Sequence, residues 1–199
     1  MTYIAAGACN TFAINKKGQL LAWSTNNFGQ TSLTAGASEP DNFIERPTIV
    51  FSLSAYSVAE IKDGHQHSIA CCEDGTVLTW GRCDDGQTGI KLENLPLEDL
   101  LLDSRDWAPI LTKPSVVPNI RYVFVTAGTD NSFALTSNGE AYSWGFSDEY
   151  RTSHGTDSMV LEAKRIQGAA LAAKKLNFAG CGGQFSILAE PAVEIANSD

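Results

Sequence analysis

The chain alternates short β-prone runs with tight turns, and the runs come in pairs. Residues 68–71 and 76–80 flank Asp74-Gly75, and residues 132–135 and 140–144 flank Asn138-Gly139. Asp-Gly or Asn-Gly between two alternating runs predicts a β-hairpin with positive φ at both turn residues. The pattern therefore indicates a protein made of β-strands joined by short turns.

Four kinds of marker recur at fixed spacing, so the chain is built of repeats. Each copy opens with a leading glycine, at Gly7, Gly64, Gly128 and Gly182. A hydroxyl residue follows four positions on, at Thr11, Ser68, Ser132 and Ser186. Eleven positions on stand Gly18, Gly75 and Gly139, sixteen on stand Trp23, Trp80 and Trp144, and twenty-two on stand Gly29, Gly86 and Tyr150. The leading glycine is expected to allow a tight turn before its strand.

The variable second half of each copy supplies further strands. Residues 47–51 and 114–117 each begin with proline, which sheets tolerate at the head of a strand or on an edge. A short apolar run then leads back to the next leading glycine. Four strands per copy with a glycine and aromatic motif in each are typical of a β-propeller. Residues 159–175 alone show helix-like spacing, and the register of the repeat favours strand, loop and strand there.

We therefore predict an all-β fold, a partial β-propeller of four-stranded blades in a single domain. The repeat units are about residues 1–57, 58–121 and 122–175, and an incomplete unit at 176–199 brings the total to about three and a half blades. Alternation turns Leu78 and Trp80 to one face and Val77 to the other, and the tryptophans pack between neighbouring sheets. Residues 91–112 are predicted to be a long inserted loop.

Composition narrows the partners. The 199 residues carry a net charge of −9, which disfavours a grip on phosphate backbones and sequence-specific nucleic-acid contact, and favours a basic protein partner. Five cysteines form no CxxC pair, which is typical of a reducing compartment. No apolar run approaches the length of a membrane span, so no membrane association is expected, and no signal peptide is recognisable.

One copy carries a specific resemblance. It runs Gly64-His65-Gln66-His67-Ser68-Ile69, then Asp74-Gly75, Trp80-Gly81-Arg82 and Asp85-Gly86-Gln87-Thr88-Gly89. This pattern resembles the repeat of the regulator of chromosome condensation family. The order and length of the variable segments resemble the C-terminal half of a Ran guanine-nucleotide exchange factor of fungal type. The resemblance implies a seven-bladed propeller closed by strands from both chain ends, so we expect this chain to be a C-terminal fragment.

By the same resemblance the protein is expected to regulate a Ran-type small GTPase in the nucleus, with histones or chromatin as further partners and no cofactor. Exchange makes and breaks no bond, so it is not an enzyme with chemistry of its own. The family's contact residues stand three positions after each leading glycine, here Asn10, His67, Asn131 and Phe185. His67 matches a family histidine tied to exchange. Asn27 and Gln184 complete the expected site, and Phe185 departs from the histidine that the family's last repeat often carries.

Other interpretations of these residues stay open. His67 can cap its own strand through a ring hydrogen bond. A metal pair of His65 and His67 lacks a third ligand, so no metal site is predicted. A Ser68–His67 nucleophile is disfavoured, because neighbours on a strand point to opposite faces. The three asparagines are also common turn residues. For the protein as a whole, the alternative is a non-catalytic propeller scaffold for protein–protein interaction.

Overall fold

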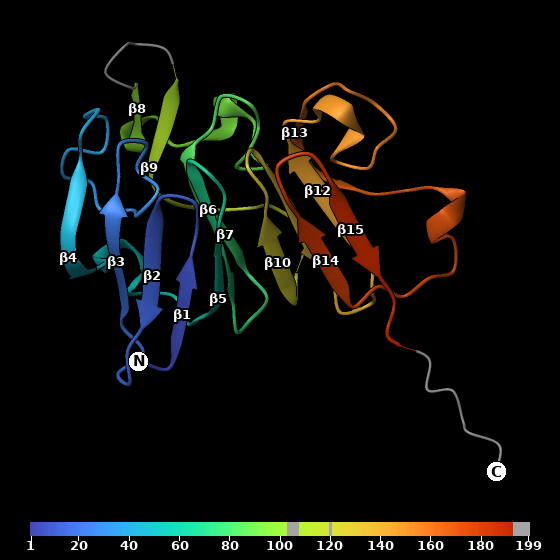
Figure 1. Cartoon of the computed structure of the whole chain (residues 1–199), viewed down its shortest axis with the longest axis horizontal. Helices are drawn as coiled ribbons and strands as arrows, with labels where there is room; N and C mark the ends of the chain where they lie inside the picture. The colour runs from blue at the N-terminus through green and yellow to red at the C-terminus, as the bar shows by residue number, and fades with distance from the viewer. Residues whose placement is uncertain (103–107, 120, 193–199) are drawn as a thin grey trace.

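The computed structural model describes residues 1–102, 108–119 and 121–192, and these form an all-β chain (Figure 1). The first sheet contains β1 (Tyr3–Ala6), β2 (Asn10–Ile14), β3 (Leu20–Thr25) and β4 (Phe43–Ile49). The second contains β5 (Val58–Asp63), β6 (His67–Cys72), β7 (Val77–Arg82), β9 (Pro109–Val116) and β8 (Leu100–Leu102), in that order. The third contains β10 (Phe124–Ala127), β11 (Asn131–Leu135), β12 (Ala141–Gly145) and β13 (Val160–Arg165). The last pair is β14 (Phe178–Cys181) and β15 (Ser186–Ala189).

The sheets stand side by side in chain order as the blades of a partial propeller. Each is antiparallel throughout, and the first strands of adjacent sheets contact one another. Five short 3₁₀ turns, at Phe51–Leu53, Leu92–Asn94, Leu97–Asp99, Asp148–Tyr150 and Ala169–Leu171, are the helical segments of the described residues. None of these segments has the length and apolar character needed to cross a bilayer. The predicted fold class is confirmed. Residues 159–175 form β13, a loop and one 3₁₀ turn, so the first strand favoured by the repeat register is present, whereas the second begins only at Phe178.

The hairpins are present, but the predicted turn type is wrong. Gly75 has φ of 82°, whereas Asp74 does not have positive φ. The Gly75 N–H donates to Cys72 O, and the Cys72 N–H donates to Thr76 O. This is a three-residue loop with a bulge, and it needs left-handed backbone at the glycine only. The first copy therefore forms the same turn from Lys17-Gly18.

The prolines also lie elsewhere than predicted. Pro47 is inside β4 and Pro114 is inside β9, not at the head of either strand. In both strands the register shifts around the proline: Ile44 pairs with Ser24 and Thr48 with Ala22 in the first sheet. Each bulge takes the proline out of the regular hydrogen-bond ladder, so its missing N–H leaves no partner unpaired, which explains why proline is tolerated inside these strands.

The inserted segment is more ordered than the predicted loop. Its described part forms two 3₁₀ turns, the short strand β8 and the beginning of β9. Leu100 pairs with Leu111, so the insertion adds a fifth strand to the second sheet. Residues 103–107, which include Trp107, lie outside the described residues.

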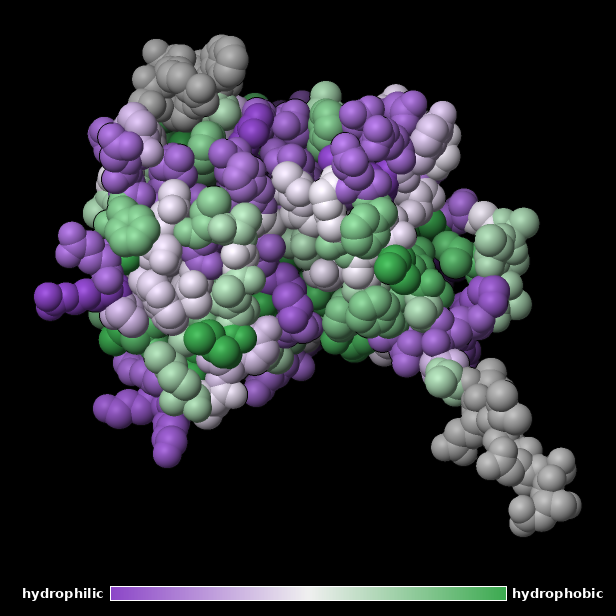
Figure 2. Space-filling model, in the orientation of Figure 1, coloured by the Kyte–Doolittle hydropathy of each residue, from purple (hydrophilic) through white to green (hydrophobic). Residues whose placement is uncertain are grey.

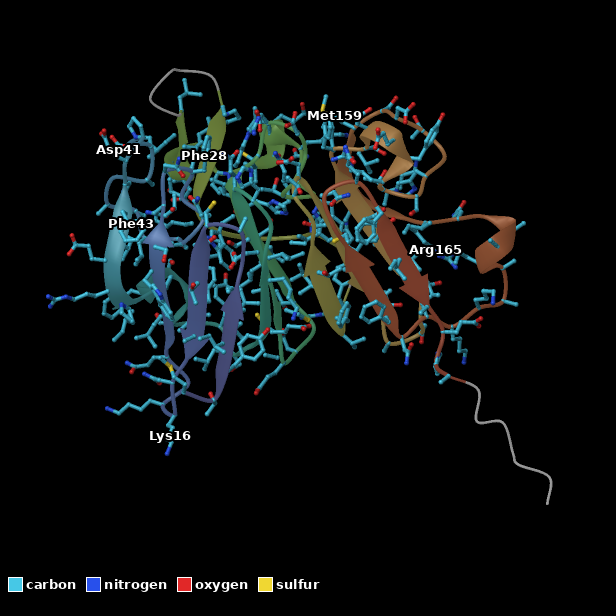
Figure 3. The ribbon with its side chains drawn as sticks, in the orientation of Figure 1. Lys16, Phe28, Asp41, Phe43, Met159 and Arg165 are labelled. Carbon is cyan, nitrogen blue, oxygen red and sulfur yellow. The ribbon has the colours of Figure 1, made fainter. Side chains whose placement is uncertain are left out.

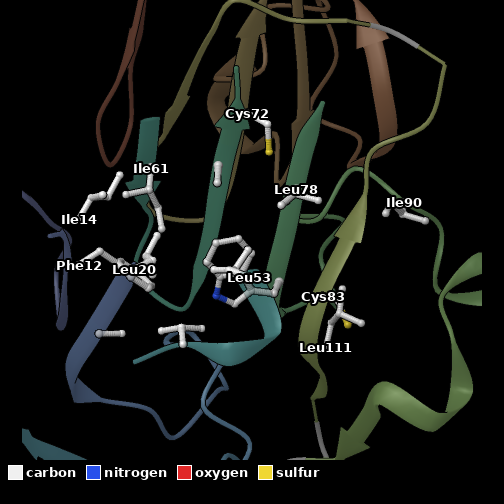
Figure 4. Packing of buried hydrophobic residues seen from close by; sticks show 14 of the residues in the cluster. Phe12, Ile14, Leu20, Leu53, Ile61, Cys72, Leu78, Cys83, Ile90 and Leu111 are labelled. Carbon is white, nitrogen blue, oxygen red and sulfur yellow. The ribbon is translucent and has the colours of Figure 1, made fainter. Parts of the chain in front are cut away.

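Two of the three repeat tryptophans, Trp80 and Trp144, join neighbouring sheets as predicted. The Trp80 ring meets Phe12 of the first sheet edge-on, with centroids 6.0 Å apart, inside the cluster drawn in Figure 4. Leu78 belongs to the same cluster, whereas Val77 packs with Trp144 in the next one. Alternation along β7 therefore divides its side chains between two cores, and both faces of the second sheet are buried.

Each buried indole also makes one hydrogen bond to the preceding repeat. Trp80 Nε1 donates to the Gln30 carbonyl at 2.8 Å, and Trp144 Nε1 donates to the Gln87 carbonyl at 2.9 Å. Both glutamines stand seven positions after the preceding tryptophan. Trp23 is only half-buried and makes no such bond within the described residues.

We expect Trp80→Phe to lower the free energy of unfolding by about 2 kcal/mol, because it removes a buried hydrogen bond and leaves a cavity. Trp23→Phe is the matched control and is expected to cost less than about 1 kcal/mol. Urea unfolding monitored by circular dichroism measures both. Equal losses would show that the indole-to-carbonyl bond does not contribute.

Candidate functional site

The loops that follow the four leading glycines lie together on one face. Strand register places them at the end of the sheets opposite the hairpins of Gly18, Gly75 and Gly139. Figure 3 shows this polarity, with Lys16 of the first hairpin at one end and Phe28, Asp41 and Met159 toward the other. We call this surface the leading-loop face. A depression of about 410 Å³ opens on it, lined by all four leading glycines together with Asp63 and His65.

The leading glycines are needed for close approach rather than for a left-handed turn. None of the four has φ in the positive region. A Cβ on Gly64 would lie 2.5 Å from the Gly128 carbonyl oxygen, and a Cβ on Gly128 would lie 2.8 Å from that of Gly182. Backbone from successive sheets therefore meets at these positions, and the expected tight turn is not their physical reason.

The position three residues after each leading glycine is a junction between sheets in three of the four copies. Asn10, His67 and Asn131 are at most 3% exposed, whereas Phe185 is 60% exposed. Asn131 Oδ1 and the Cβ of Cys181, in the next sheet, both lie within 3.3 Å of where a Gly128 Cβ would be. The structure thus places these predicted residues at successive junctions instead of on open surface.

His67 joins the second and third sheets. Its Nε2 lies 2.9 Å from Ser132 Oγ, so the ring does not cap its own strand. Nδ1 is buried and has no partner within the described residues. Burial lowers the pKa of the imidazole to about 4, so His67 is neutral at pH 7.

The remaining predicted residues are more accessible. Gln184 is exposed beside Phe185, whose ring covers Gly182 on the leading-loop face. Asn27 is half-buried in the turn after β3, where its Oδ1 accepts a hydrogen bond from Gln30 Nε2 at 3.2 Å. Apolar side chains gather over β14 and β15 in Figure 2, and Phe178 and Ile187 are about half exposed there.

Two residues that the sequence did not single out join the leading loops to their surroundings. Arg82 holds Asp84 through Nε at 2.7 Å and reaches Gln66 Oε1 through Nη1 at 2.9 Å. Asp63 ends β5 and hydrogen-bonds Ser68, where the other copies carry Ala6, Ala127 or Cys181 before the leading glycine. An aspartate where the other copies carry a small residue is the sequence signal that could have pointed to Asp63. No cluster of three or more His, Cys, Asp or Glu suited to a metal occurs among the described residues.

The comparisons with known proteins agree with this geometry. Residues 122–151 match the model of the regulator of chromosome condensation (RCC1) repeat. Over 94% of its length the chain is 36% identical to protein pim1 of Schizosaccharomyces pombe. The crystal structure of Prp20p from Saccharomyces cerevisiae superposes on 97% of the chain with a TM-score of 0.88 at 30% identity. Residues 122–151 therefore form a regulator of chromosome condensation repeat, and the chain is similar to these fungal proteins over nearly its whole length.

The chain matches only part of the length of each of these relatives. It is 32% identical over 187 residues to guanine nucleotide exchange factor SRM1 of Saccharomyces cerevisiae. The chain spans 35% of pim1, 38% of SRM1 and 44% of the Prp20p chain, and therefore less than half of each. Human WBSCR16, at 14% identity and a TM-score of 0.53, shares the fold alone.

The His67 junction predicts a pH effect. Because the folded pKa lies below the ordinary value near 6.5, the unfolded chain binds more protons between these values, and stability falls as pH falls from about 6.5 to about 4. His67→Asn, which copies the residue of two other repeats, is expected to reduce this loss by about 2 kcal/mol. Urea unfolding at pH 7 and pH 4.5 measures it. His65→Asn, on the exposed neighbour, is the control, and an unchanged pH dependence in His67→Asn would contradict the assignment.

Proposed function

We propose that the protein to which this chain belongs is a guanine-nucleotide exchange factor for a Ran-type small GTPase. The observation that carries the proposal is the match over nearly the whole chain to fungal proteins of this class. SRM1 is named as a guanine nucleotide exchange factor, and the Prp20p structure is described together with binding to Gsp1p and histones. A nuclear location and a histone partner belong to the same proposal. The net charge of −9 supports the histone partner, because an acidic protein attracts basic partners.

The proposed action is linkage, and no covalent step is involved. A factor that binds the nucleotide-free GTPase better than the nucleotide-bound form weakens nucleotide binding by the same factor. A surface pressed against the phosphate-binding loop achieves this by disturbing the backbone amides that hold the phosphates. The leading-loop face is the surface we assign to the GTPase, since four repeats present equivalent loops there.

The six predicted residues then divide into two roles. We propose that Gln184, Phe185 and Asn27 contact the GTPase directly, because their side chains are at least partly accessible. Asn10, His67 and Asn131 support the face from the junctions between sheets. A direct contact by His67 requires its loop to open, since the imidazole is fully buried.

A chimaera tests whether the chain can act in exchange. In it, the chain replaces the segment of SRM1 to which it aligns, and release of a fluorescent GDP analogue from Gsp1p is followed. We expect release well above the spontaneous rate, because the fold and face are shared over almost the full segment. A folded chimaera that leaves the rate unchanged would contradict the proposal.

A substitution of Phe185 tests whether this side chain contacts the GTPase or only supports the fold. We expect Phe185→Ala in the chimaera to slow exchange by about tenfold, which is the loss of about 1.4 kcal/mol typical of an exposed aromatic contact. Phe51→Ala is the matched control, because Phe51 is 75% exposed at the opposite end of the sheets. Equal rates for the two variants would remove Phe185 from the site.

A non-catalytic scaffold is the second candidate. It is favoured by the burial of three of the four positions three residues after the leading glycines. Repeats of this kind also occur in larger proteins, since the chain is 29% identical to part of the E3 ubiquitin-protein ligase HERC2 of Homo sapiens. A folded chimaera that binds Gsp1p without releasing nucleotide would support this candidate.

A further inference from the structure

The junction between the first and second sheets contains a hydroxyl with two acceptors. Ser68 Oγ lies 2.7 Å from the Gln30 carbonyl oxygen and also contacts Asp63 Oδ1. A serine hydroxyl has one proton to donate, and a carbonyl oxygen has none. If Ser68 donates to Asp63, two oxygens face each other at 2.7 Å without a proton between them. Both contacts are satisfied only if Asp63 supplies a second proton.

The next junction has the same arrangement with a different donor. Ser132 Oγ lies 3.4 Å from the Gln87 carbonyl and 2.9 Å from His67 Nε2. A neutral His67 protonated on Nε2 donates to Ser132, and Ser132 donates to Gln87. That tautomer leaves Nδ1 as an acceptor, and Nδ1 has no partner within the described residues. At both junctions the serine oxygen needs a group that donates a hydrogen bond to it. His67 is that donor at the second junction, and Asp63 occupies the equivalent place at the first.

The surroundings of Asp63 disfavour a charge. Its neighbours across the junction are Asn10 of β2 and Gly7, where a Cβ would lie 2.2 Å from the Asp63 Cβ. No cation among the described residues raises or lowers its pKa. Lys62 and Glu60, the nearest charges on β5, pair with each other at 2.9 Å. Oδ2 is buried and receives no hydrogen bond from the described residues, which costs less for a neutral carbonyl oxygen than for a carboxylate.

We propose that Asp63 is a neutral carboxylic acid in the folded chain and acts as a positioning residue whose proton holds β6 against the turn that follows β3. The acid donates to Ser68 Oγ, and Ser68 donates to the Gln30 carbonyl, which also accepts from Trp80 Nε1. The proton thus completes the link that holds the sheets together at the edge of the depression. Loss of the proton reverses the Ser68 hydroxyl and breaks its bond to Gln30.

The consequence is a pH-dependent junction in the neutral range. Burial raises the pKa of the Asp63 carboxyl to about 7, against the lowering effect of the Ser68 and Asn10 side chains. Between the ordinary value of 3.8 and about 7 the folded chain holds more protons than the unfolded chain. Stability from this group is therefore present at low pH and is lost as pH rises through about 7.

Carbon-detected NMR on the uniformly labelled 199-residue chain tests the protonation state directly. We expect the Asp63 carboxyl carbon to titrate with a midpoint near 7, and the Ser68 hydroxyl environment to change with it. A midpoint below about 5 would overturn the proposal, because an acid of ordinary strength is ionised at pH 6. This measurement needs no substitution and does not depend on nucleotide exchange.

Asp63→Asn tests the consequence for stability. Its amide N–H can donate to Ser68 at every pH, so the variant keeps the relay without a titrating group. Each unit of pKa shift changes the unfolding equilibrium constant tenfold. We therefore expect the ratio of the wild-type constant to that of Asp63→Asn to rise at least about tenfold between pH 5 and pH 8.5. Asp41→Asn, on an exposed aspartate, is the charge control. A pH-independent ratio of the two constants would contradict the proton-dependent junction.

Discussion

In each of the first two repeats, one backbone carbonyl holds its sheet to the next one. Gln30 O receives Trp80 Nε1 and Ser68 Oγ, both from the next sheet, and Gln87 O receives Trp144 Nε1 in the same way. The donors are 38 to 57 residues away along the chain, so these bonds fix how one blade leans on the next. Buried side-chain donors need partners, and the turn after each third strand provides them. The serine and tryptophan spacing of the repeat follows from this one requirement.

The sequence predicted the repeat, the all-β class and the division of side chains along β7, because these depend on local spacing. Fixed intervals from glycine to serine to tryptophan imply equal hairpins, and equal hairpins stack only as blades. The turn type and the position of Pro47 were not predictable from the same pattern. Each depends on a bulge that involves a partner strand, and the sequence does not show that partner.

The burial of His67 was also beyond the sequence. Strand alternation distinguishes two faces of a sheet, but in a propeller blade both faces are covered. Whether the residue three positions after a leading glycine lies inside or outside depends on the next sheet. His67 is buried because Ser132 of the next sheet stands beside it, 65 residues further on. The ring of Phe185 stays exposed because no further sheet follows β15 among the described residues. The family resemblance pointed to this position but did not reveal which copies are accessible.

The difference between copies at this position has a physical reason. Ser68 and Ser132 each donate to a turn carbonyl and then require a donor of their own, which Asp63 supplies at the first junction and His67 at the second. The donor can therefore come from either of the two sheets. Where the neighbouring sheet supplies it, the residue three positions after the leading glycine need not be a donor and can be of another type. At the junction of Asn10, the donor to the serine is Asp63, and the Asn10 amide makes no hydrogen bond within the described residues. Variation at the junctions thus reflects how each serine is satisfied, and it does not by itself mark contact with a partner. Accessible residues such as Gln184 and Phe185 are for that reason the ones we propose for contact with a partner.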